Sequence, residues 1–403
     1  MNNKSIAVIG VGTAGLQTLC HLCTWLGNDW KIISIHDPSI PTVRIGESTN
    51  PPFAITLQMA TDFNVHDHLE ALRGTIKIGT VFKKWRRHNF INPLYAGTMA
   101  LHIDAFNLKQ FVIPSLKKRW GDKIEIKSQR VEKIEDLDYD YIVDCRGFPK
   151  DYSDYIEPEG LTINRAITHN IAKQGNWNYT GHRATKNGWM FEIPLMDRRA
   201  YGYLFNDTIT SKEEAMEDFS KEIDTPIDRL DENKCKSCIA DYSFKPYYAK
   251  EFVKGRIFRN GNRAMFFEPL SANSLFVYDA INRLIVERLQ LKWGSDEIVN
   301  KLYREKVESI RDLIYYYYHG GSTYNTKFWV KASHLASKEL DKSESFKKIK
   351  SEFKYYNNIG TPYLTSIWGL ESHCLKVIDE QMGYNYFNDK ESYSRLKLKI
   401  MES

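Results

Sequence analysis

A glycine-rich turn directly after an apolar strand pattern is the feature that most restricts the fold of this chain. The segment KSIAVIG predicts a buried strand, and TAGLQTLCHLCTWLG predicts a helix that starts in the turn and ends at Gly27. WKIISIHD follows as a second strand, which completes a βαβ unit. The turn between strand and helix holds Gly10, Gly12 and Gly15, at the spacing of a dinucleotide fingerprint.

Each glycine of this turn has a separate task in such a fingerprint. Gly10 allows the tight turn, Gly12 lets a pyrophosphate approach the backbone at the helix N-terminus, and Gly15 allows the helix to pack closely on the strand. We expect Thr13 and Ala14, which lie between the last two glycines, to contact the cofactor as well. The sequence thus predicts an α/β fold with a Rossmann-like core.

The residues after the second strand and two remote patches indicate which dinucleotide binds. An acid is expected at the end of the second strand, where it binds the adenosine ribose. Asp37 lies 22 residues after Gly15, and its neighbour His36 is the alternative at this position. The remote patches are DYIVDCRG and NGNRAMFFEPLSANS, and no second fingerprint for a nicotinamide occurs. We therefore predict FAD, bound by a glutathione-reductase-type core.

The composition narrows the class of protein. Among 403 residues 42% are hydrophobic and 27% charged, which is typical of a globular protein. The formal net charge of +5 is spread among interspersed acids and bases, so we expect no nucleic-acid partner. No run reaches the ~18 apolar residues of a membrane span, and the first apolar run lacks a signal-peptide cleavage site. We expect a cytoplasmic protein that binds no membrane.

Six cysteines are too few for a disulfide scaffold, although two pairs have the spacing of metal ligands. Cys20 and Cys23 fall inside the predicted first helix, and the second pair is Cys235 and Cys238. We expect free, partly buried thiols and no metal site.

No repeat or low-complexity linker divides the chain, so the cofactor and substrate regions are expected to interleave. GWMFEIPL and RAYGYLFN predict a pair of strands in a second, mixed sheet, and helix patterns dominate from residue 272 onward. We assign residues 1–48, 100–175 and 250–292 to an FAD-binding region. Residues 49–99, 176–249 and 293–403 are assigned to a helix-rich substrate-binding region.

The segment IKIGTVFKKW alternates like one strand and places Lys77 on a side that it shares with Gly79 and Val81. From this spacing alone Lys77 would be a surface lysine near Lys83 and Lys84. The interpretation changes when Lys77 is considered together with motifs elsewhere in the chain.

Several motifs together resemble those of the flavin-dependent halogenases of the tryptophan-halogenase type. GVGTAG resembles the first signature of that family, IPTVRIGESTNPPF its segment after the second strand, and Lys77 falls where the family has its essential lysine. GWMFEIP resembles the Trp-x-Trp-x-Ile-Pro signature, EPLSANS the flavin loop, and IRDLIYYYYHGGSTYNTKFW a substrate-side helix with its sequel. The matches extend from residue 6 to residue 329, and the nearest resemblance that we can name is to a phage-encoded member.

The resemblance implies an enzyme that halogenates a free small aromatic or heteroaromatic molecule. Reduced FAD, O₂ and a halide ion would give a flavin hydroperoxide and then hypohalous acid, which passes through the protein to Lys77. Lys77 would hydrogen-bond the hypohalous acid or form an N-haloamine beside the substrate. A separate NAD(P)H-dependent flavin reductase is the implied partner.

The resemblance also assigns residues to the flavin. Glu47 and Ser48 would contact its ring, although the same residues could cap the following turn. The loop residues Gly261, Pro269 and Leu270 would bind the cofactor from the other side.

Further residues are assigned to the halide and to the wall between flavin and substrate. Asn273 and Ser274 would bind the halide, or they are simply helix-capping residues. Trp189, Phe191 and Pro194 would line the tunnel and keep the flavin apart from the substrate.

The chain departs from the family pattern at two residues and in length. Phe191 replaces the second tryptophan of the signature, which keeps an aromatic wall but removes an indole donor. Ser271 stands at the catalytic position where the family usually has a glutamate that assists the lysine or takes the arene proton. The chain is also shorter, with less sequence for a lid over one substrate. We therefore expect iodination and bromination of several electron-rich substrates, with weak chlorination.

Two other functions are compatible with the sequence at this point. One is a single-component flavin monooxygenase, and the other is a catalytically silent FAD-binding protein, which the serine at position 271 would explain. The four tyrosines at 315–318 cannot share one helical face, so we expect at least one to pack and another to line the substrate pocket. Because such a stretch makes a poor solvent face, we also expect a homo-oligomer.

Overall fold

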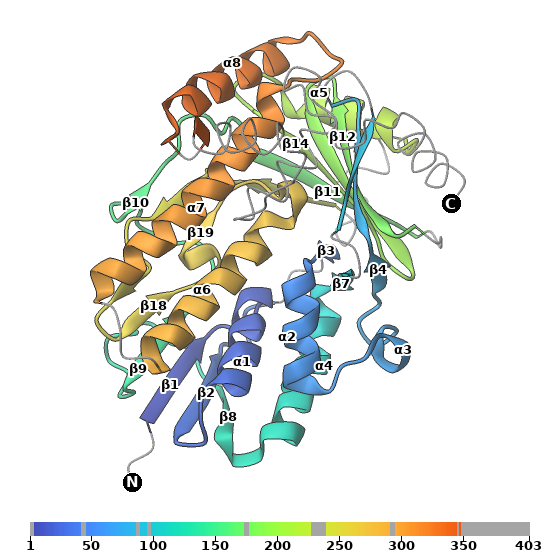
Figure 1. Ribbon diagram of the computed structural model, residues 1–403. Coiled ribbons are helices and arrows are strands. Elements are labelled where there is room, and N and C mark those ends of the chain that lie inside the picture. The colour runs from blue at the N-terminus through green and yellow to red at the C-terminus, as the bar shows by residue number, and fades with distance from the viewer. Residues whose placement is uncertain are drawn as a thin grey trace, which may run out of the picture.

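The computed structural model describes residues 4–41, 46–85, 89–94, 98–172, 177–226, 239–290, 295–344 and 346–347. These residues form an α/β fold with two large sheets and a small sheet between them (Figure 1). The first large sheet lies in the lower part of Figure 1 and the second in the upper right.

The first sheet contains the predicted βαβ unit, in which α1 (Thr13–Trp25) joins β1 (Lys4–Ile9) to β2 (Trp30–His36). Its six strands have the order β17-β18-β9-β1-β2-β8, and all pairs are parallel except β17 with β18. The remaining strands are β8 (Ile124–Ser128), β9 (Tyr141–Asp144), β17 (Val253–Lys254) and β18 (Ile257–Arg259). Strands from distant segments therefore lie side by side in this sheet: β9 belongs to the segment DYIVDCRG, and β18 ends directly before NGNRAMFFEPLSANS.

Helices cover one face of this sheet. α2 (Pro51–Thr61), α4 (Ala105–Trp120) and α6 (Asn273–Gln290) contact α1. α4 begins where Asp104 accepts a hydrogen bond from the backbone NH of Asn107 at 2.8 Å, so Asp104 is the cap of this helix. The short 3₁₀ helix η1 (Gly121–Lys123) then leads into β8.

The second sheet has seven strands in the order β15-β11-β14-β13-β12-β5-β6. The predicted strand pair is present as β13 (Gly188–Pro194) and β14 (Arg198–Phe205), which are antiparallel. The other strands are β5 (Gly79–Lys83), β6 (Phe90–Pro93), β11 (Arg165–Ala172), β12 (Tyr179–Thr185) and β15 (Ile239–Ser243). Only β5 with β12 is a parallel pair among these strands, so this sheet is mixed.

The small sheet joins the two large ones and corrects the expectation of one continuous strand around Lys77. It contains β3 (Gly46–Ser48), β7 (Ala100–Asp104) and β4 (Thr75–Lys77), all antiparallel. The chain leaves β4 after Lys77 and enters β5 of the seven-stranded sheet at Gly79. Ile78 between them bonds through its backbone to Asn178 and Leu94 instead of continuing β4. The alternation that suggested one strand is therefore shared between two sheets.

The remaining elements complete the helix-rich part of the fold. α7 (Asp296–His319) packs between α6 and α8 (Lys327–Lys342), and α5 (Lys212–Glu222) contacts β14. A further three-stranded sheet has β16 (Tyr247–Ala249) between β10 (Tyr155–Ile156) and β19 (Met265–Phe266). The short elements are α3 (Val65–His68), η3 (Gly261–Arg263) and η4 (Leu270–Ala272).

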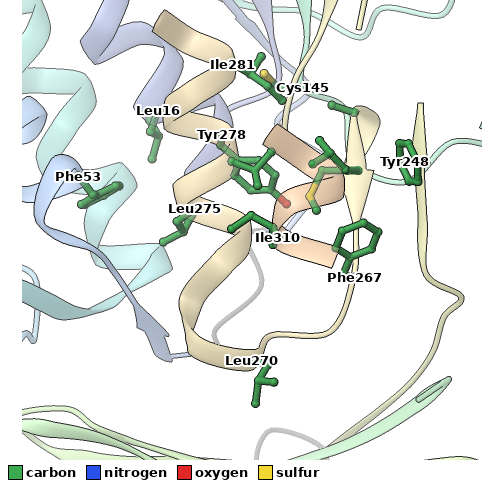
Figure 2. Packing of buried hydrophobic residues seen from close by; sticks show 14 of the residues in the cluster. Leu16, Phe53, Cys145, Tyr248, Phe267, Leu270, Leu275, Tyr278, Ile281 and Ile310 are labelled. Atoms are coloured by element: carbon green, nitrogen blue, oxygen red, sulfur yellow. The ribbon is translucent and has the colours of Figure 1, made fainter. Parts of the chain in front are cut away.

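One large apolar core runs through both the cofactor side and the helical side of the molecule. Figure 2 shows part of it, in which Leu16 of α1, Leu275, Tyr278 and Ile281 of α6, and Ile310 of α7 all belong to the same cluster. The division into interleaved regions stays a prediction. The small sheet takes β3 and β7 from the predicted FAD-binding region and β4 from the predicted substrate region.

The tyrosines at 315–318 correct a second expectation. All four are buried, with exposed fractions of 1–2%. α7 is covered on several sides, so residues on different helical faces each find a buried partner. The argument for a homo-oligomer rested on exposure of this stretch and therefore no longer holds.

Within the described ranges, no helix is both long enough and apolar enough to cross a membrane. The same residues contain no group of three or more His, Cys, Asp or Glu side chains that could hold a metal ion. Cys20 and Cys23 are free and buried in α1, and burial raises the pKa of the Cys23 thiol to about 12. Cys235 and Cys238 lie outside the described residues.

Candidate active site

A cleft with a volume of ≈ 1940 Å³ follows the carboxyl edge of the first sheet and reaches the second sheet. Its wall includes residues of the glycine turn, of the segment after β2, of β3 and of the turn after β9. At the far end it is bordered by Thr180 and His182 of β12, Phe191 and Ile193 of β13, and Leu204 of β14. The volume and the position at the strand ends are typical of a dinucleotide site.

The three fingerprint glycines have distinct surroundings. Gly10 has φ +102°, and a Cβ there would lie 2.7 Å from the carbonyl oxygen of Cys145. A Cβ on Gly15 would lie only 2.0 Å from the carbonyl oxygen of Gly10. A Cβ on Gly12, by contrast, would have no atom within 4 Å. Gly10 and Gly15 thus hold turn and helix together, whereas Gly12 leaves space open in the cleft.

The start of α1 suits an anion. Gly12 is the N-cap residue, and no side chain caps this end of α1. The first turn also contains no acidic residue that would repel a negative charge. The uncapped backbone NH groups and the open space at Gly12 fit the pyrophosphate of a dinucleotide.

Both candidates for the ribose position, Asp37 and His36, line the cleft. The Asp37 carboxylate accepts hydrogen bonds from the backbone NH and the hydroxyl of Ser39, and these bonds lower its pKa. Asp37 is therefore an anionic acceptor, as the ribose hydroxyls require. Burial, followed by the charge of Lys109, lowers the pKa of His36.

The other residues assigned to the cofactor fall into two groups. Lining the cleft are Gly10, Gly12, Thr13, Ala14, Glu47, Ser48 and Pro269. Gly15, Gly261 and Leu270 do not line it but pack behind its wall. Gly261 has φ +63°, and a Cβ there would lie 2.6 Å from the Cβ of Ala14. Gly261 therefore lets η3 pack against the start of α1.

Glu47 brings a carboxyl group to the wall of the cleft. Burial raises its pKa to about 7, while a hydrogen bond from Thr13 lowers it and the charge of Asp104 raises it further. Its Oε2 atom has no partner among the described residues. A buried carboxyl oxygen without a partner, facing a cleft, fits a hydrogen-bonding group on a bound cofactor.

Lys77 is buried, with 3% of its surface exposed, which excludes the surface position that its spacing suggested. Its Nζ donates a hydrogen bond of 3.0 Å to the carbonyl oxygen of Thr49. Thr49 is in turn fixed to β7, because its backbone NH and its hydroxyl both bond to Leu101. The ammonium group is thus anchored at the junction of the small sheet and the seven-stranded sheet.

The charge of Lys77 affects the pKa of two buried histidines, His182 and His102. Burial, and then the charge of Lys77, lowers the pKa of His182 to about 3, against a smaller opposite effect of the Pro269 carbonyl. The same two causes lower the pKa of His102 well below its usual value. Both imidazoles are therefore neutral near pH 7.

The signature residues of β13 form a wall at the far end of the cleft. Phe191 lines the cleft and packs on Gly202, where a Cβ would lie 2.2 Å from its ring. Trp189 is fully buried behind it, with ring centroids 6.2 Å from Trp85 and 5.2 Å from His182. Pro194 is buried and accepts a hydrogen bond from Thr75 through its carbonyl oxygen. Of the three residues, only Phe191 lines the cleft, and their role as a wall between flavin and substrate stays a prediction.

Ser271 is held in an unusual backbone conformation. It has φ 57° and ψ 22°, and Ala272 after it also has a positive φ of 59°. The backbone NH of Ser271 donates to Nε2 of His182 at 3.3 Å, and its hydroxyl lies 3.2 Å from that of Tyr317. Phe82 stacks between His182 and Tyr317, at centroid distances of 5.1 and 4.8 Å.

The start of α6 contains the residues assigned to the halide. Asn273 is 3% exposed, and its side-chain NH₂ group has no partner among the described residues. Ser274 lines the cleft. A buried donor without a partner at a helix N-terminus is compatible with an anion.

Sequence reasoning missed three buried polar residues around this site: Thr180, His182 and Glu268. Thr180 and His182 alternate on the strand before the aromatic signature, a period-two signal that could have placed both toward the cleft. Glu268 is 1% exposed and accepts a hydrogen bond of 2.8 Å from the Tyr318 hydroxyl. Its contact with α7 could not be read from local sequence.

This fold with this cleft defines a dinucleotide-binding α/β protein. A family model described as tryptophan halogenase matches residues 5–124 and 115–359. The chain therefore belongs to the tryptophan halogenase family, which consists of flavin-dependent enzymes. The predicted family and the assignment as an enzyme are confirmed.

Similar proteins of known activity and structure agree with this assignment. The chain is 22% identical to tryptophan 6-halogenase ThaL of Streptomyces albogriseolus, covering 85% of this chain and 80% of that protein. It is 24% identical to tryptophan 7-halogenase RebH of Lentzea aerocolonigenes, with coverages of 83% and 79%. A tryptophan halogenase structure from Shewanella frigidimarina has a TM-score of 0.76 at 15% identity, covering 100% of this chain and 93% of that one. The flavin-dependent halogenase Xcc4156 of Xanthomonas campestris has a TM-score of 0.74 at 17% identity, with coverages of 88% and 84%. These structures confirm the predicted fold class.

Substitutions at two fingerprint glycines should separate cofactor binding from folding. Gly12→Val places a side chain in the open cleft, so we expect FAD affinity to fall at least ~10²-fold while the cofactor-free protein keeps its stability. Gly15→Ala forces a Cβ against the Gly10 carbonyl oxygen, so we expect the free energy of unfolding to fall by ~1–3 kcal/mol. Flavin titration and denaturant unfolding measure the two effects. Unchanged FAD affinity in Gly12→Val would show that the pyrophosphate does not bind at this turn.

Glu268→Gln should reduce the pH dependence of stability. Burial raises the pKa of Glu268 to about 8, so between pH 4.5 and 8 the unfolded chain has released a proton that the folded protein retains. The free energy of unfolding of the wild type should fall over this range, by at most ~5 kcal/mol at 1.36 kcal/mol per pKa unit. Gln still accepts a hydrogen bond from Tyr318 but does not ionise, so the variant should lose less stability in denaturant titrations. The same slope in both proteins would mean that Glu268 ionises normally when folded.

Proposed function

We propose that the chain halogenates free small aromatic or heteroaromatic molecules with FADH₂, O₂ and a halide, and prefers iodide and bromide to chloride. The observation that supports this function most directly is Lys77. A lysine is rarely buried, and this one is 3% exposed, close enough to His182 of the cleft wall to lower its pKa, and at the position of the essential lysine of the family.

The residues of the cleft fit FAD. The open turn at Gly12 and the uncapped start of α1 would hold the pyrophosphate, and Asp37 or His36 the ribose. Glu47, Ser48 and Pro269 would contact the flavin end, with Gly261 and Leu270 supporting the wall from behind. When bound in its reduced form, FAD would supply, with O₂ and a halide, the hypohalous acid that the reaction uses.

The start of α6 would bind the halide. The side-chain NH₂ group of Asn273 offers a buried donor, and Ser274 stands on the wall of the cleft. Both residues follow the Ser271–Ala272 turn, whose positive φ angles set the direction in which the helix begins. An anion here would lie beside the flavin end of the cleft.

Lys77 would act on the hypohalous acid after it leaves the flavin. Its Nζ donates a hydrogen bond of 3.0 Å to the Thr49 carbonyl, and the same charged donor group would polarise an oxidant that binds beside it. His102 and His182 are neutral and do not neutralise its charge. Loss of a proton from Nζ would make the same atom a nucleophile toward the electrophilic halogen.

The wall formed by Phe191 and Trp189 would keep the substrate away from the flavin, so that oxygen is not transferred directly. The relatives named above halogenate tryptophan, and an aromatic substrate suits the ring-lined side of this wall. A separate NAD(P)H-dependent flavin reductase would provide FADH₂. We propose a cytoplasmic location, in keeping with such a partner.

Lys77→Met should abolish product formation and leave cofactor binding intact. Met keeps the length and apolar stem of the buried side chain but has no hydrogen to donate, so we expect halogenation to fall at least ~10²-fold. Mass spectrometry of a panel of phenols, indoles and azoles, incubated with enzyme, FAD, a flavin reductase and each halide, measures the product. A scavenger of free hypohalous acid must be present. Product formation at the wild-type rate under these conditions would remove Lys77 from the mechanism.

The halide preference should follow from Ser271. Without a glutamate at this position the site offers less help with the chemical step, so the more easily oxidised iodide and bromide should react across several electron-rich substrates. Chloride should react weakly or not at all. Competition between equal concentrations of the three halides decides the order, and preferential chlorination of one tightly bound substrate would contradict it. Ser271→Glu should increase chlorination. If the wild type binds FAD but gives no product with any halide, the alternative of a catalytically silent FAD-binding protein holds instead.

A further inference from the structure

A chain of buried and partly buried hydrogen bonds links the small sheet to the seven-stranded sheet close to Lys77. Ser48 Oγ lies 2.7 Å from Thr180 Oγ1, which lies 2.9 Å from Nε2 of His102. Nδ1 of His102 lies 2.9 Å from Thr75 Oγ1, and Thr75 donates a 2.7 Å hydrogen bond to the carbonyl oxygen of Pro194. We call these five groups the Ser48–Pro194 chain.

The Ser48–Pro194 chain links the small sheet to two neighbouring strands of the seven-stranded sheet. Ser48, His102 and Thr75 form one row across β3, β7 and β4, where His102 is the cross-strand neighbour of both others. The two ends of the row bond to the seven-stranded sheet, through Thr180 on β12 and Pro194 on β13. The chain thus fastens the small sheet to the large one at two points.

Lys77 lies at the junction between the small sheet and the seven-stranded sheet. It is the last residue of β4, two positions after Thr75, and after it the backbone passes through Ile78 into the seven-stranded sheet. The position of its Nζ therefore depends on how the two sheets are joined. Backbone hydrogen bonds of Ile78 to Asn178 and Leu94 hold one side of this joint, and the side chains of the Ser48–Pro194 chain add contacts between the two sheets at β12 and β13.

The direction of every hydrogen in the chain is determined. The Pro194 carbonyl can only accept, so the Thr75 hydroxyl gives its hydrogen there and accepts one from Nδ1 of His102. The neutral ring then accepts at Nε2 from Thr180, which leaves Thr180 to accept from Ser48. The Ser48 hydroxyl, on the wall of the cleft, is left with lone pairs but no hydrogen for a ligand. A chain with one consistent direction is rigid, because reversing it would leave the Pro194 carbonyl without its donor.

We propose that the Ser48–Pro194 chain positions Lys77 relative to the flavin end of the cleft, with His102 and Thr75 as positioning residues. This inference rests on the proposed function. Its consequence is that disrupting the chain should impair the transfer of the halogen to the substrate more than the formation of hypohalous acid. Oxidant that misses Lys77 would escape into solution.

The test compares Thr75→Val with Thr75→Ser. Valine has nearly the shape of threonine but breaks both hydrogen bonds of this residue, whereas serine retains the hydroxyl. In the presence of substrate and a soluble trap for hypohalous acid, we expect Thr75→Val to lower the ratio of halogenated substrate to halogenated trap at least ~10-fold. Serine should restore the ratio. The kcat for substrate halogenation should fall with little change in KM.

A second pair, Thr180→Val and Thr180→Ser, breaks the same chain at its other end and should give the same ratios. This pair covers the case in which Thr75→Val does not fold. Equal ratios in the valine and serine variants of both pairs would overturn the inference. A parallel loss of halogenated trap and halogenated substrate would also overturn it, because that result indicates a purely structural role. If the wild type halogenates neither substrate nor trap, the proposed function itself fails, and that result is seen before any variant is made.

Discussion

The structure depends on how a buried ammonium group is accommodated at a junction between sheets. Lys77 ends β4 and has almost no contact with solvent, so its charge must be compensated by polar groups within the protein. The Thr49 carbonyl accepts one hydrogen, and two nearby imidazoles remain neutral in its field. The small sheet supplies these groups: His102 lies on β7, which pairs with β4, and Thr49 follows β3 and bonds to Leu101 of β7. The position of the Lys77 amine therefore depends on correct pairing of the strands in the small sheet.

The cleft and the lysine are built by different parts of the fold, which meet at the aromatic wall. Close contact of Gly15 with Gly10 sets the helix on the strand and leaves Gly12 facing open space. Across the cleft, Phe191 separates this space from the rings around Trp189. A cofactor held on one side and a substrate on the other would communicate only through a small diffusing molecule. This arrangement suits the relay that the family resemblance implies.

Local patterns predicted most of the fold, because the βαβ unit, the β13–β14 pair and the long helices each bury an apolar face with a regular period. The single strand predicted around Lys77 was wrong, since the alternation of its residues does not reveal that the backbone changes sheets at Ile78. The tyrosines at 315–318 were also misjudged, because burial on several sides of α7 depends on its neighbours α6 and α8. His182, Thr180 and Glu268 acquire their environments from contacts distant in sequence, such as that between Glu268 and Tyr318. The assignment of individual residues to FAD, halide and substrate stays a prediction.

The concentration of tyrosine and tryptophan around the wall has a chemical consequence. Under the proposed function an electrophilic halogen would travel past side chains that are themselves electron-rich aromatic substrates. Phenolate reacts far more readily with such an electrophile than phenol does. Burial raises the pKa of Tyr318 well above its ordinary value, and the same cause raises that of Tyr278. Keeping these rings protonated would protect them under this function, so that burial would also limit self-inactivation.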